Sequence, residues 1–307
     1  MAEAIAFIEG KFVPTSEAKI SILEPTFTKS DVVYDTLSSW SGYIFRLDEH
    51  LQRFKNSYES MELNPPYSID EIRHVVAESI FRSEFENTCV TLMATRGPFI
   101  DILDRDIRKC KNGLIAVCVP YYWVLGEHSQ ANGVNLSIAE NHRVPASSID
   151  AKIKNFNWMD LTRGLLNAYK NGGDSTVLCT PDGLLSEGYG FNIWLAKNGK
   201  IFTPQGNLLE GVTRSTVFDL AKEMQIEACE QSLTPDDLRT ADEAFTSTTA
   251  GGITPVTQID GKTLGNGAPG ILTTKILSEY WARREAGWKG TLVTDVLNEN
   301  AVNEASV

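Results

Sequence analysis

The stretch "SSIDAKIKNFNW" at residues 147–158 decides how this chain is interpreted. It carries Lys152 and Lys154 in an alternating pattern typical of a β-strand, where residues two apart share a face. Both ammonium groups would then lie beside the rings of Phe156 and Trp158. A lysine shielded from water loses part of its preference for the charged form, and a neutral amine forms a Schiff base with an aldehyde. Most lysines beside rings only extend to solvent, so the stretch alone leaves both interpretations open.

The composition argues against several classes of function. The chain has 307 residues, enough for about two domains, and a net charge of −12, which argues against nucleic acid or an anionic membrane as partner. Segment 1–12 lacks the basic region of a signal peptide, and no apolar run approaches the roughly 18 residues of a membrane span. The five cysteines form no CxxC pair, which favours reduced thiols in the cytoplasm. The spacing of the four histidines indicates no metal site.

The N-terminal part predicts a small unit of mixed helices and strands. Its expected elements are a hairpin turning at Ser41-Gly42, helices over 48–63 and 68–83, and strands over 87–97 and 113–120. Asp48 is the expected N-cap of the first helix, Met61 ends its apolar stripe, and Ser68 opens the second helix with a capping box. The charged loop 98–112 is long for a hairpin, which is typical of a lid or a disordered segment.

Residues 120–126 indicate a linker, so we expect one domain over 1–119 and a second over 127–307. The second contains the lysine strand, helices over about 158–170, 211–224 and 270–286, and hairpins turning at 181–183 and 197–199. Residues 292–307 show no apolar period and predict a frayed tail. "GNGAPG" at 265–270 matches GxGxxG, but Pro269 removes an amide donor and little chain follows, so we interpret it as a turn.

Three further features suit an aldehyde that also carries a pyridine ring and a phosphate. Glu187, where a strand ends in a Gly-rich bend, offers a carboxylate to a pyridine nitrogen. Val212 and Thr213 begin a helix whose amides and dipole suit a phosphate. Thr248 and Thr249 offer a second anion seat on a turn of small residues. Each feature has an ordinary structural explanation, but together they supply an amine, an acid and two anion seats, which indicates pyridoxal phosphate.

The motifs "SSIDAKIKNFNW", "SEGYGFNIW", "EGVTR" and "TSTTAGGITP", in that order, resemble the fold-type IV pyridoxal-phosphate aminotransferases. The N-terminal "FRLDEHLQRF" matches as well, and the resemblance extends to about residue 285. It is strongest to the (R)-selective amine transaminase branch, to which branched-chain and D-amino-acid aminotransferases are related. The resemblance implies an α+β fold with a small α/β N-terminal domain, a larger pseudo-barrel C-terminal domain, and a homodimer with the cofactor between the domains.

The resemblance also assigns residues of the cofactor site. Lys154 matches the Schiff-base lysine, whereas Lys152 falls outside the motif as a solvated strand-end residue. Glu187 matches the partner of the pyridine nitrogen. Arg53 matches the phosphate-binding arginine, although helix periodicity alone places it in solvent. The remaining phosphate contacts match Val212, Thr213 and Thr249, with Thr248 adjacent.

The substrate positions are assigned in the same way. Those that match are Tyr34, Thr36, Cys89, Thr91 and Trp158, together with Lys29, which stands where the amine-transaminase pattern has His. Cys89 replaces an aromatic residue and Thr36 an aliphatic one, which predicts a wider pocket at Cys89. On the predicted lid, Arg105 is the first candidate and Arg108 the second to bind a substrate carboxylate, because arginine forms bidentate pairs. Solvated lid charges explain either arginine equally well.

The expected activity is therefore transfer of an amino group from an (R)-amine, arylalkyl or aliphatic, to a keto acid such as pyruvate by a ping-pong mechanism. Lys154 would move the proton while Glu187 keeps the ring electron-poor. The alternative is a D-amino-acid or branched-chain aminotransferase, followed by aminodeoxychorismate lyase and by a barrel that has lost its cofactor. Expected partners are the small-molecule amine and keto acid, with no metal, nucleic acid or membrane.

Overall fold

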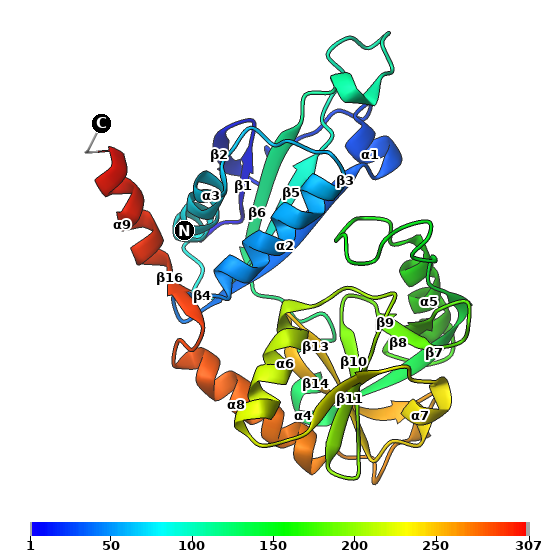
Figure 1. Cartoon of the computed structure of the whole chain (residues 1–307). Coiled ribbons are helices and arrows are strands. Elements are labelled where there is room, and N and C mark those ends of the chain that lie inside the picture. The colour runs from blue at the N-terminus through cyan, green and yellow to red at the C-terminus, as the bar shows by residue number, and fades with distance from the viewer. Residues whose placement is uncertain (1, 305–307) are drawn as a thin grey trace. The chain divides into compact units, whose positions relative to one another are not determined.

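The computed structural model describes the backbone of residues 2–304 and divides the chain into two compact units (Figure 1). The first unit comprises the described parts of 1–121 and 284–307 together with 153–157, and the second comprises 122–152 and 158–283. This division differs from the predicted domains, because two segments of the expected C-terminal domain belong to the first unit. Backbone pairing is the reason: Asn155 bridges to Val33, and Thr291 pairs with Ile44.

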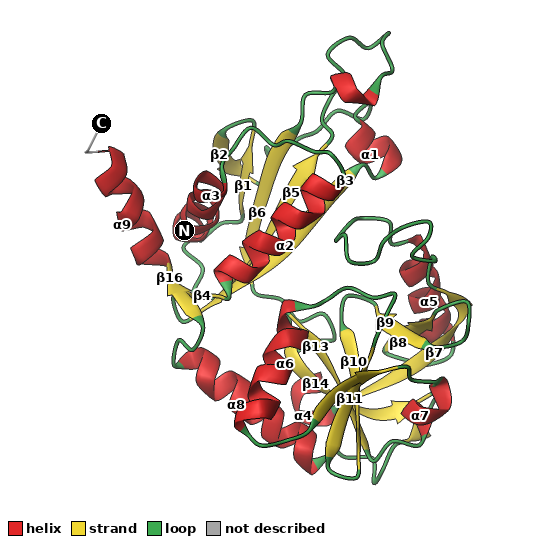
Figure 2. Ribbon diagram, in the orientation of Figure 1, coloured by secondary structure: helices red, strands yellow, loops and turns green. Residues whose placement is uncertain are grey.

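The first unit is an antiparallel sheet with helices on one face (Figure 2). Among the described residues its seven strands follow the order β16-β4-β3-β5-β6-β1-β2. The strands are β1 (Ile5–Ile8), β2 (Lys11–Pro14), β3 (Val32–Trp40), β4 (Tyr43–Phe45), β5 (Thr88–Thr95), β6 (Gly113–Pro120) and β16 (Gly290–Leu292). The helices are α1 (Pro25–Lys29), α2 (Leu47–Ser60), α3 (Ile69–Ser83), α9 (Val293–Glu304) and the 3₁₀ turn η1 (Ile107–Lys109).

Strand β3 gives the two faces of this sheet different roles. Val33 and Leu37 point into the core that α2 and α3 cover, where Phe54 is fully buried. Tyr34 and Thr36 lie on the opposite face because side chains alternate along a strand. One face of the sheet therefore stabilises the fold, while the other carries tyrosine and threonine side chains.

The local signals at the N-terminal end are largely confirmed. Trp40 pairs with Tyr43 across a two-residue turn in which Ser41 and Gly42 have φ of 50° and 80°, the left-handed geometry of a tight hairpin. Helix α3 begins with the predicted capping box, since the Ser68 side chain accepts from the Glu71 amide at 3.3 Å.

The N-cap of α2 and the last residue of its apolar stripe were predicted wrongly. Arg46, with φ of 49°, is the N-cap, so Asp48 lies inside the first turn, where a carboxylate is favourable to the helix dipole. Met61 lies beyond the end of the helix and is 38% exposed, so it does not belong to the apolar stripe.

The predicted frayed tail is also wrong for the described residues. β16 pairs with β4, and α9 follows directly. Val293 and Val296 are buried in the core of the first unit. Helix α9 contributes few apolar residues to that core. They are too few to form a hydrophobic period that could be detected in the sequence. Residues 305–307 of the predicted tail lie outside the described residues.

The second unit is a curled sheet of the pseudo-barrel kind that was predicted. Its nine strands, counted within the described residues, follow the order β12-β11-β10-β13-β14-β7-β8-β9, with β15 paired to β14. The terminal strand β9 approaches β10 and β11, so the sheet curls towards closure. The strands are β7 (Val134–His142), β8 (Ser175–Cys179), β9 (Leu185–Gly188), β10 (Asn192–Lys197), β11 (Lys200–Pro204), β12 (Ala228–Gln231), β13 (Glu243–Thr248), β14 (Gly252–Ile259) and β15 (Lys262–Thr263). The helices are α4 (Ser129–Asn132), α5 (Met159–Lys170), α6 (Val212–Glu223), α7 (Pro235–Arg239) and α8 (Ile271–Glu285).

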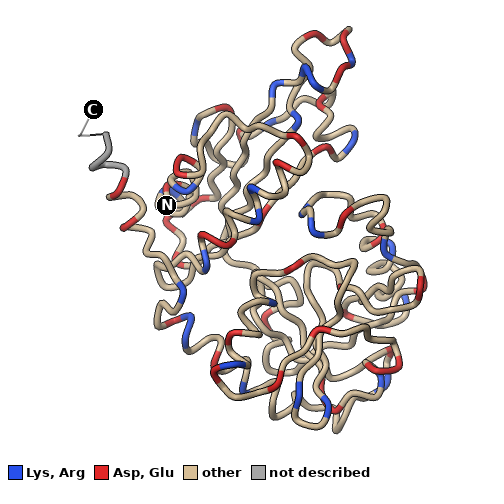
Figure 3. The backbone as a smooth tube through the Cα atoms, viewed as in Figure 1, with Lys and Arg blue, Asp and Glu red and all other residues tan. Residues whose placement is uncertain are grey.

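The turns at 198–199 and 265–270 in this part were predicted correctly. Lys197 pairs with Lys200 across Asn198-Gly199, and residues 265–270 form a turn before α8, as predicted. Within residues 2–304 no helix has both the length and the apolar character of a membrane span. Acidic and basic residues are distributed over both units (Figure 3).

Candidate active site

The stretch 147–158 is not the predicted strand. It consists of turns with one antiparallel bridge, between Asn155 and Val33. Asn155 competes with strand formation, because its side chain accepts from the Asn157 amide at 2.9 Å and donates to the Ile153 carbonyl at 2.7 Å. The bridge forms where the edge of β3 lies beyond the reach of the short strand β4.

Lys154 is held through its backbone on both sides. Its N–H donates to Ser57 Oγ of α2 at 3.2 Å, and its carbonyl accepts from the Tyr34 amide at 2.9 Å. The Nζ atom lies 3.2 Å from Tyr34 Oη and 4.3 Å from the centre of that ring, which packs at 4.4 Å against the ring of Phe156. A hydroxyl both donates and accepts, so Tyr34 can bond to this amine in its charged and its neutral state.

Lys152 has a different environment. Its side chain is 61% exposed and forms an ion pair with Glu210 at 2.8 Å, and the bond to that carboxylate raises the pKa of Lys152. The prediction that Lys152 is solvated is confirmed, although it lies in a turn and not at a strand end.

A buried charge cluster in the first unit positions Arg53. Asp35 of β3 is fully buried and accepts from Arg53 Nε at 2.7 Å and from its terminal nitrogen Nη2 at 2.8 Å. His50 Nδ1 lies 2.7 Å from the same carboxylate. Asp35 thus takes two of the five N–H donors of Arg53 and fixes the plane of the guanidinium. Arg53 is only 14% exposed, so helix periodicity misplaced it, and the resemblance is the better guide to its environment.

The cluster shifts the pKa of two groups. Burial would raise the pKa of Asp35, but the charge of Arg53 and the bonds from Arg53 and His50 outweigh it and hold the pKa well below its ordinary value. Burial lowers the pKa of His50, and the positive charges of Arg53 and Lys154 act in the same direction against Asp35. Asp35 is therefore ionised and His50 neutral near pH 7.

A second charge cluster, in the second unit, positions Glu187 of β9. Arg143 donates to Glu187 Oε1 at 3.0 Å and to Asp160 Oδ2 at 2.6 Å, and the Leu209 amide donates to Glu187 Oε2 at 3.2 Å. Glu187 is 7% exposed and the Asp160 side chain 8%. Two carboxylates and one guanidinium leave this buried cluster with an excess negative charge, which suits a cationic partner.

The two predicted anion seats both belong to the second unit. Val212 and Thr213 form the buried first turn of α6, whose N-cap Gly211 provides no side-chain cap to the amides. Thr248 ends β13, and its hydroxyl donates to the Gly190 carbonyl at 2.8 Å, so that proton is not directed to an anion. Thr249 begins the following turn and is partly buried.

The predicted substrate residues occupy varied positions. Thr36 and Thr91 are paired in the sheet with their hydroxyls 3.4 Å apart, on the face that carries Tyr34. Cys89 is fully buried, whereas Lys29 is exposed at the end of α1. In the second unit, Trp158 makes an edge-to-face contact with Tyr189, with ring centres 4.8 Å apart.

The two lid arginines differ in their partners. Arg108 donates through Nε and Nη2 to Asp106, which holds the pKa of that carboxyl at about 2. Arg105 stacks on the ring of Phe99 at 4.7 Å and makes no ion pair within the residues that the structure describes. Arg105 is therefore the better candidate for a carboxylate, in the order that the sequence suggested.

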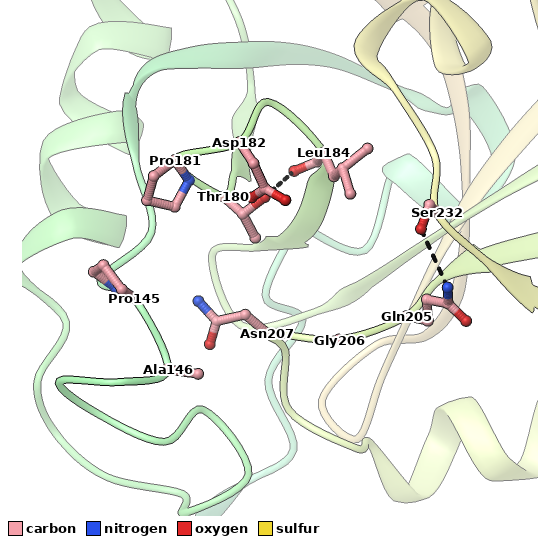
Figure 4. Close-up of a pocket in the computed structure, with 10 residues that line it drawn as sticks. All are labelled: Pro145, Ala146, Thr180, Pro181, Asp182, Leu184, Gln205, Gly206, Asn207 and Ser232. Carbon is pink, nitrogen blue, oxygen red and sulfur yellow. Dashed lines mark hydrogen bonds between the residues drawn. The ribbon is translucent and has the colours of Figure 1, made fainter.

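A cavity of about 560 Å³ opens on the second unit (Figure 4). Its polar side chains bond mainly to neighbouring protein groups: Gln205 donates to Ser232 Oγ at 3.1 Å, and Asn207 donates to the Val144 carbonyl at 2.8 Å. None of the residues assigned from the motifs lines it. The cavity therefore offers no chemistry that connects it with Lys154 or Glu187.

Sequence reasoning missed the residues that hold the assigned ones. Asp35 leaves a signal, since it is a carboxylate between Val33 and Leu37 on the buried face of a strand. Arg143 and Asp160 leave none, because Arg143 pairs with Glu187 and with Asp160 across 44 and 17 positions of the chain.

The chemically reactive groups are divided between the two units: Lys154 and Arg53 belong to the first, and Glu187 and Val212 to the second. A half-buried lysine amine, an arginine and a helix N-terminus suited to a phosphate, and a carboxylate cluster suited to a ring nitrogen are what an aldehyde cofactor with a phosphate and a pyridine ring requires. The residues present therefore fit pyridoxal phosphate.

The family model of amino-transferase class IV matches residues 32–259, so the chain belongs to the class IV aminotransferases. A putative branched-chain-amino-acid aminotransferase of Methanocaldococcus jannaschii is 32% identical over 277 residues, which cover 89% of this chain and 94% of that protein. The D-alanine aminotransferase of Bacillus licheniformis is 30% identical over 273 residues, 87% of this chain and 92% of that protein.

Among solved structures, the branched-chain amino acid aminotransferase from T.th. with pyridoxamine 5'-phosphate matches with a TM-score of 0.88. The identity is 26%, and the match covers 95% of this chain and 99% of that one. The predicted fold class and the prediction of an aminotransferase are thereby confirmed.

Proposed function

We propose that this aminotransferase moves amino groups between amino acids and 2-oxo acids, with branched-chain amino acids as its donors. The observation that carries the proposal is the branched-chain relative that is 32% identical over 94% of its own length. The (R)-amine activity that the motifs favoured first therefore ranks behind the alternative, and D-amino acids come second because of the D-alanine relative.

Pyridoxal 5'-phosphate is the cofactor, and it supplies an aldehyde that reacts with amines and a ring that withdraws electrons from the substrate. We propose that Lys154 makes the covalent link to the aldehyde and that Glu187 holds the protonated ring nitrogen. Arg53, the first-turn amides at Val212 and Thr213, and Thr249 would hold the phosphate. The bidentate pair with Asp35 supports this role of Arg53, because it fixes the guanidinium in advance.

The protein's own residues then divide the work. Lys154 takes the proton from the substrate and returns it, which requires an amine that can change its charge. Tyr34 holds that amine through its hydroxyl, 3.2 Å away. Arg143 holds the Glu187 carboxylate through a hydrogen bond of 3.0 Å, so that this acceptor is fixed in place for a cationic partner.

The substrate carboxylate is assigned to the lid. Arg105 carries a charge without a partner carboxylate among the described residues, on a loop that can open to water, which avoids burying the guanidinium unpaired when an apolar side chain binds. We also propose that the protein works as a homodimer in the cytoplasm. The absence of disulfides among its five cysteines and the exposed side chains of Phe27 and Leu103, which a second copy would cover, support that state.

An activity panel tests the substrate assignment. The purified protein would be given L-leucine, L-valine, D-alanine and (R)-1-phenylethylamine, each with pyruvate and with 2-oxoglutarate. We expect kcat/KM to be highest for the branched-chain amino acids. Preference for the (R)-amine by tenfold or more would contradict the proposal and restore the first interpretation. Lys154→Ala, with an unchanged circular dichroism spectrum, is the blank.

A further inference from the structure

The loop Thr249–Gly251 joins β13 to β14 and carries the second anion seat. Thr248 and Gly252 are paired at its base, so three residues make the whole connection. Gly251 and Gly252 have φ of 140° and 62°, values that favour glycine. A Cβ atom on Gly252 would lie 2.6 Å from the ring of Tyr280, so the loop is also closely packed.

Two carbonyls of the loop accept hydrogen bonds from residues outside it. The Ala250 carbonyl accepts from the Val124 amide at 3.0 Å. The Gly251 carbonyl accepts from Gln130 Nε2 at 3.1 Å. In a trans peptide the C=O and the following N–H point in opposite directions. Because the Ala250 carbonyl points to the Val124 amide, the Gly251 N–H points to the opposite side of the loop.

Gln130 is itself fixed by a third element. Trp281 of α8 donates through Nε1 to Gln130 Oε1 at 3.2 Å, and Gln130 Nε2 also donates to Thr254 Oγ1 at 2.8 Å. Because an indole nitrogen only donates, Trp281 dictates that the amide oxygen of Gln130 faces it and that the NH₂ group faces Gly251. Trp123 packs against Trp281 with ring centres 5.3 Å apart, which limits movement of the indole.

We propose that Gln130, oriented by Trp281, is a positioning residue for phosphate binding at the Thr249–Gly251 loop. The inference rests on the proposed function, in which Thr249 contacts the cofactor phosphate. In this role Gln130 acts through the backbone of the loop and not as a direct ligand of the phosphate. It fixes the peptide planes of the loop, so that the loop does not have to become ordered when the phosphate binds.

The test compares two ligands that differ only in the phosphate. The full chain, freed of cofactor, is titrated with pyridoxal 5'-phosphate and with pyridoxal while the absorbance of the bound ring is followed. Gln130→Met keeps the length of the side chain and removes its three amide hydrogen bonds, to Gly251, to Thr254 and from Trp281. We expect the dissociation constant of pyridoxal 5'-phosphate to rise about tenfold, because the loop loses the hydrogen bond that fixes it, and that of pyridoxal to stay within about twofold.

Two further variants keep the test decisive. Trp281→Phe retains a ring and removes only the N–H donor, so a rise of about threefold for the phosphate ligand is expected even if Gln130→Met folds poorly. Gln205→Met is the matched control, because Gln205 bonds to Ser232 on another loop, and it should change neither constant.

Thr249→Ala separates the two claims. If it leaves the affinity for pyridoxal 5'-phosphate unchanged, the proposed phosphate contact is wrong, and the inference falls with it. If Thr249→Ala weakens that affinity while Gln130→Met and Trp281→Phe do not, the positioning role alone is overturned. An equal loss for pyridoxal and pyridoxal 5'-phosphate in Gln130→Met would also overturn it.

Discussion

Asp35 and Arg143 have opposite roles in the two units. In the first unit a fully buried carboxylate holds a cation, Arg53, whereas in the second a buried guanidinium holds an anion, Glu187. Asp35 has no backbone donor among its described bonds, but Glu187 also accepts from the Leu209 amide. The first cluster therefore depends on one side chain, while the second distributes its bonds, and removal of the central residue should have different effects.

The largest effect is expected for Asp35→Asn. The substitution leaves the charge of Arg53 in a site that is mostly shielded from water, so the free energy of unfolding should fall by about 3 kcal/mol. Urea unfolding monitored by tryptophan fluorescence measures it. Asp48→Asn, which affects an exposed ion pair with Arg73 and a first-turn carboxylate of α2, is the matched control and should cost no more than about 1 kcal/mol. Equal losses in both variants would contradict the role of Asp35.

Arg143→Met is expected to cost less, about 2 kcal/mol, because it removes charged hydrogen bonds while backbone amides still serve both carboxylates. Asp160 keeps the amides of Val144 and Leu161, at 2.9 and 2.8 Å. The same urea experiment compares this variant with Asp35→Asn, and Arg239→Met, an exposed arginine of the same unit, serves as control. A loss larger than that of Asp35→Asn would reverse the comparison.

Of the two charge clusters, the one around Asp35 contains a histidine, His50. The free energy of unfolding should therefore depend on pH through this cluster. Burial places the pKa of His50 below its ordinary value, so the unfolded chain takes up the proton first as the pH falls. Stability is then complete above about pH 6.5 and decreases below it by up to about 1.4 kcal/mol per pH unit. Asp35, whose pKa is also lowered, adds a second loss below about pH 4.

His50→Gln tests this assignment. Unfolding free energies measured in urea between pH 7.5 and pH 5 should show a shallower slope in the variant than in the natural protein. An identical slope in the two proteins would mean that another group is responsible.

The smallest effect is expected for Lys152→Ala. The side chain is 61% exposed and, within the described part of the chain, bonds only to the exposed Glu210, so activity and melting temperature should stay within experimental error. Steady-state kinetics are measured for Lys152→Ala and Lys154→Ala side by side. Activity should be lost in Lys154→Ala. A tenfold loss in Lys152→Ala would show that both lysines take part.

Local signals were sufficient for part of the fold. The turn at Ser41-Gly42 and the capping box at Ser68 depend on adjacent residues, and both were predicted correctly. The stretch 147–158 was misjudged because the side-chain bonds of Asn155 override an alternating pattern. The C-terminal helix α9 was missed because its burial depends on packing against the first unit.

For the proposed site, the sequence suggested only the reactive groups. Lys154 and Glu187 follow from motifs, and Arg53 follows from resemblance alone. Asp35, Arg143 and Asp160 act through contacts between segments that are distant in sequence, and no local period reports such contacts. Resemblance therefore identified the residues proposed to meet the cofactor, and the structure was needed to find those that hold them.

Lys154 is proposed to carry the cofactor, and borohydride reduction followed by peptide mapping examines this assignment without relying on activity. Reduction of the yellow protein makes the link permanent, and trypsin cannot cleave after a modified lysine. If Lys154 carries the cofactor, the labelled peptide runs over 153–163, from Ile153 to Arg163. A labelled peptide over 144–154 would place the cofactor on Lys152 and rule out Lys154 as the Schiff-base lysine.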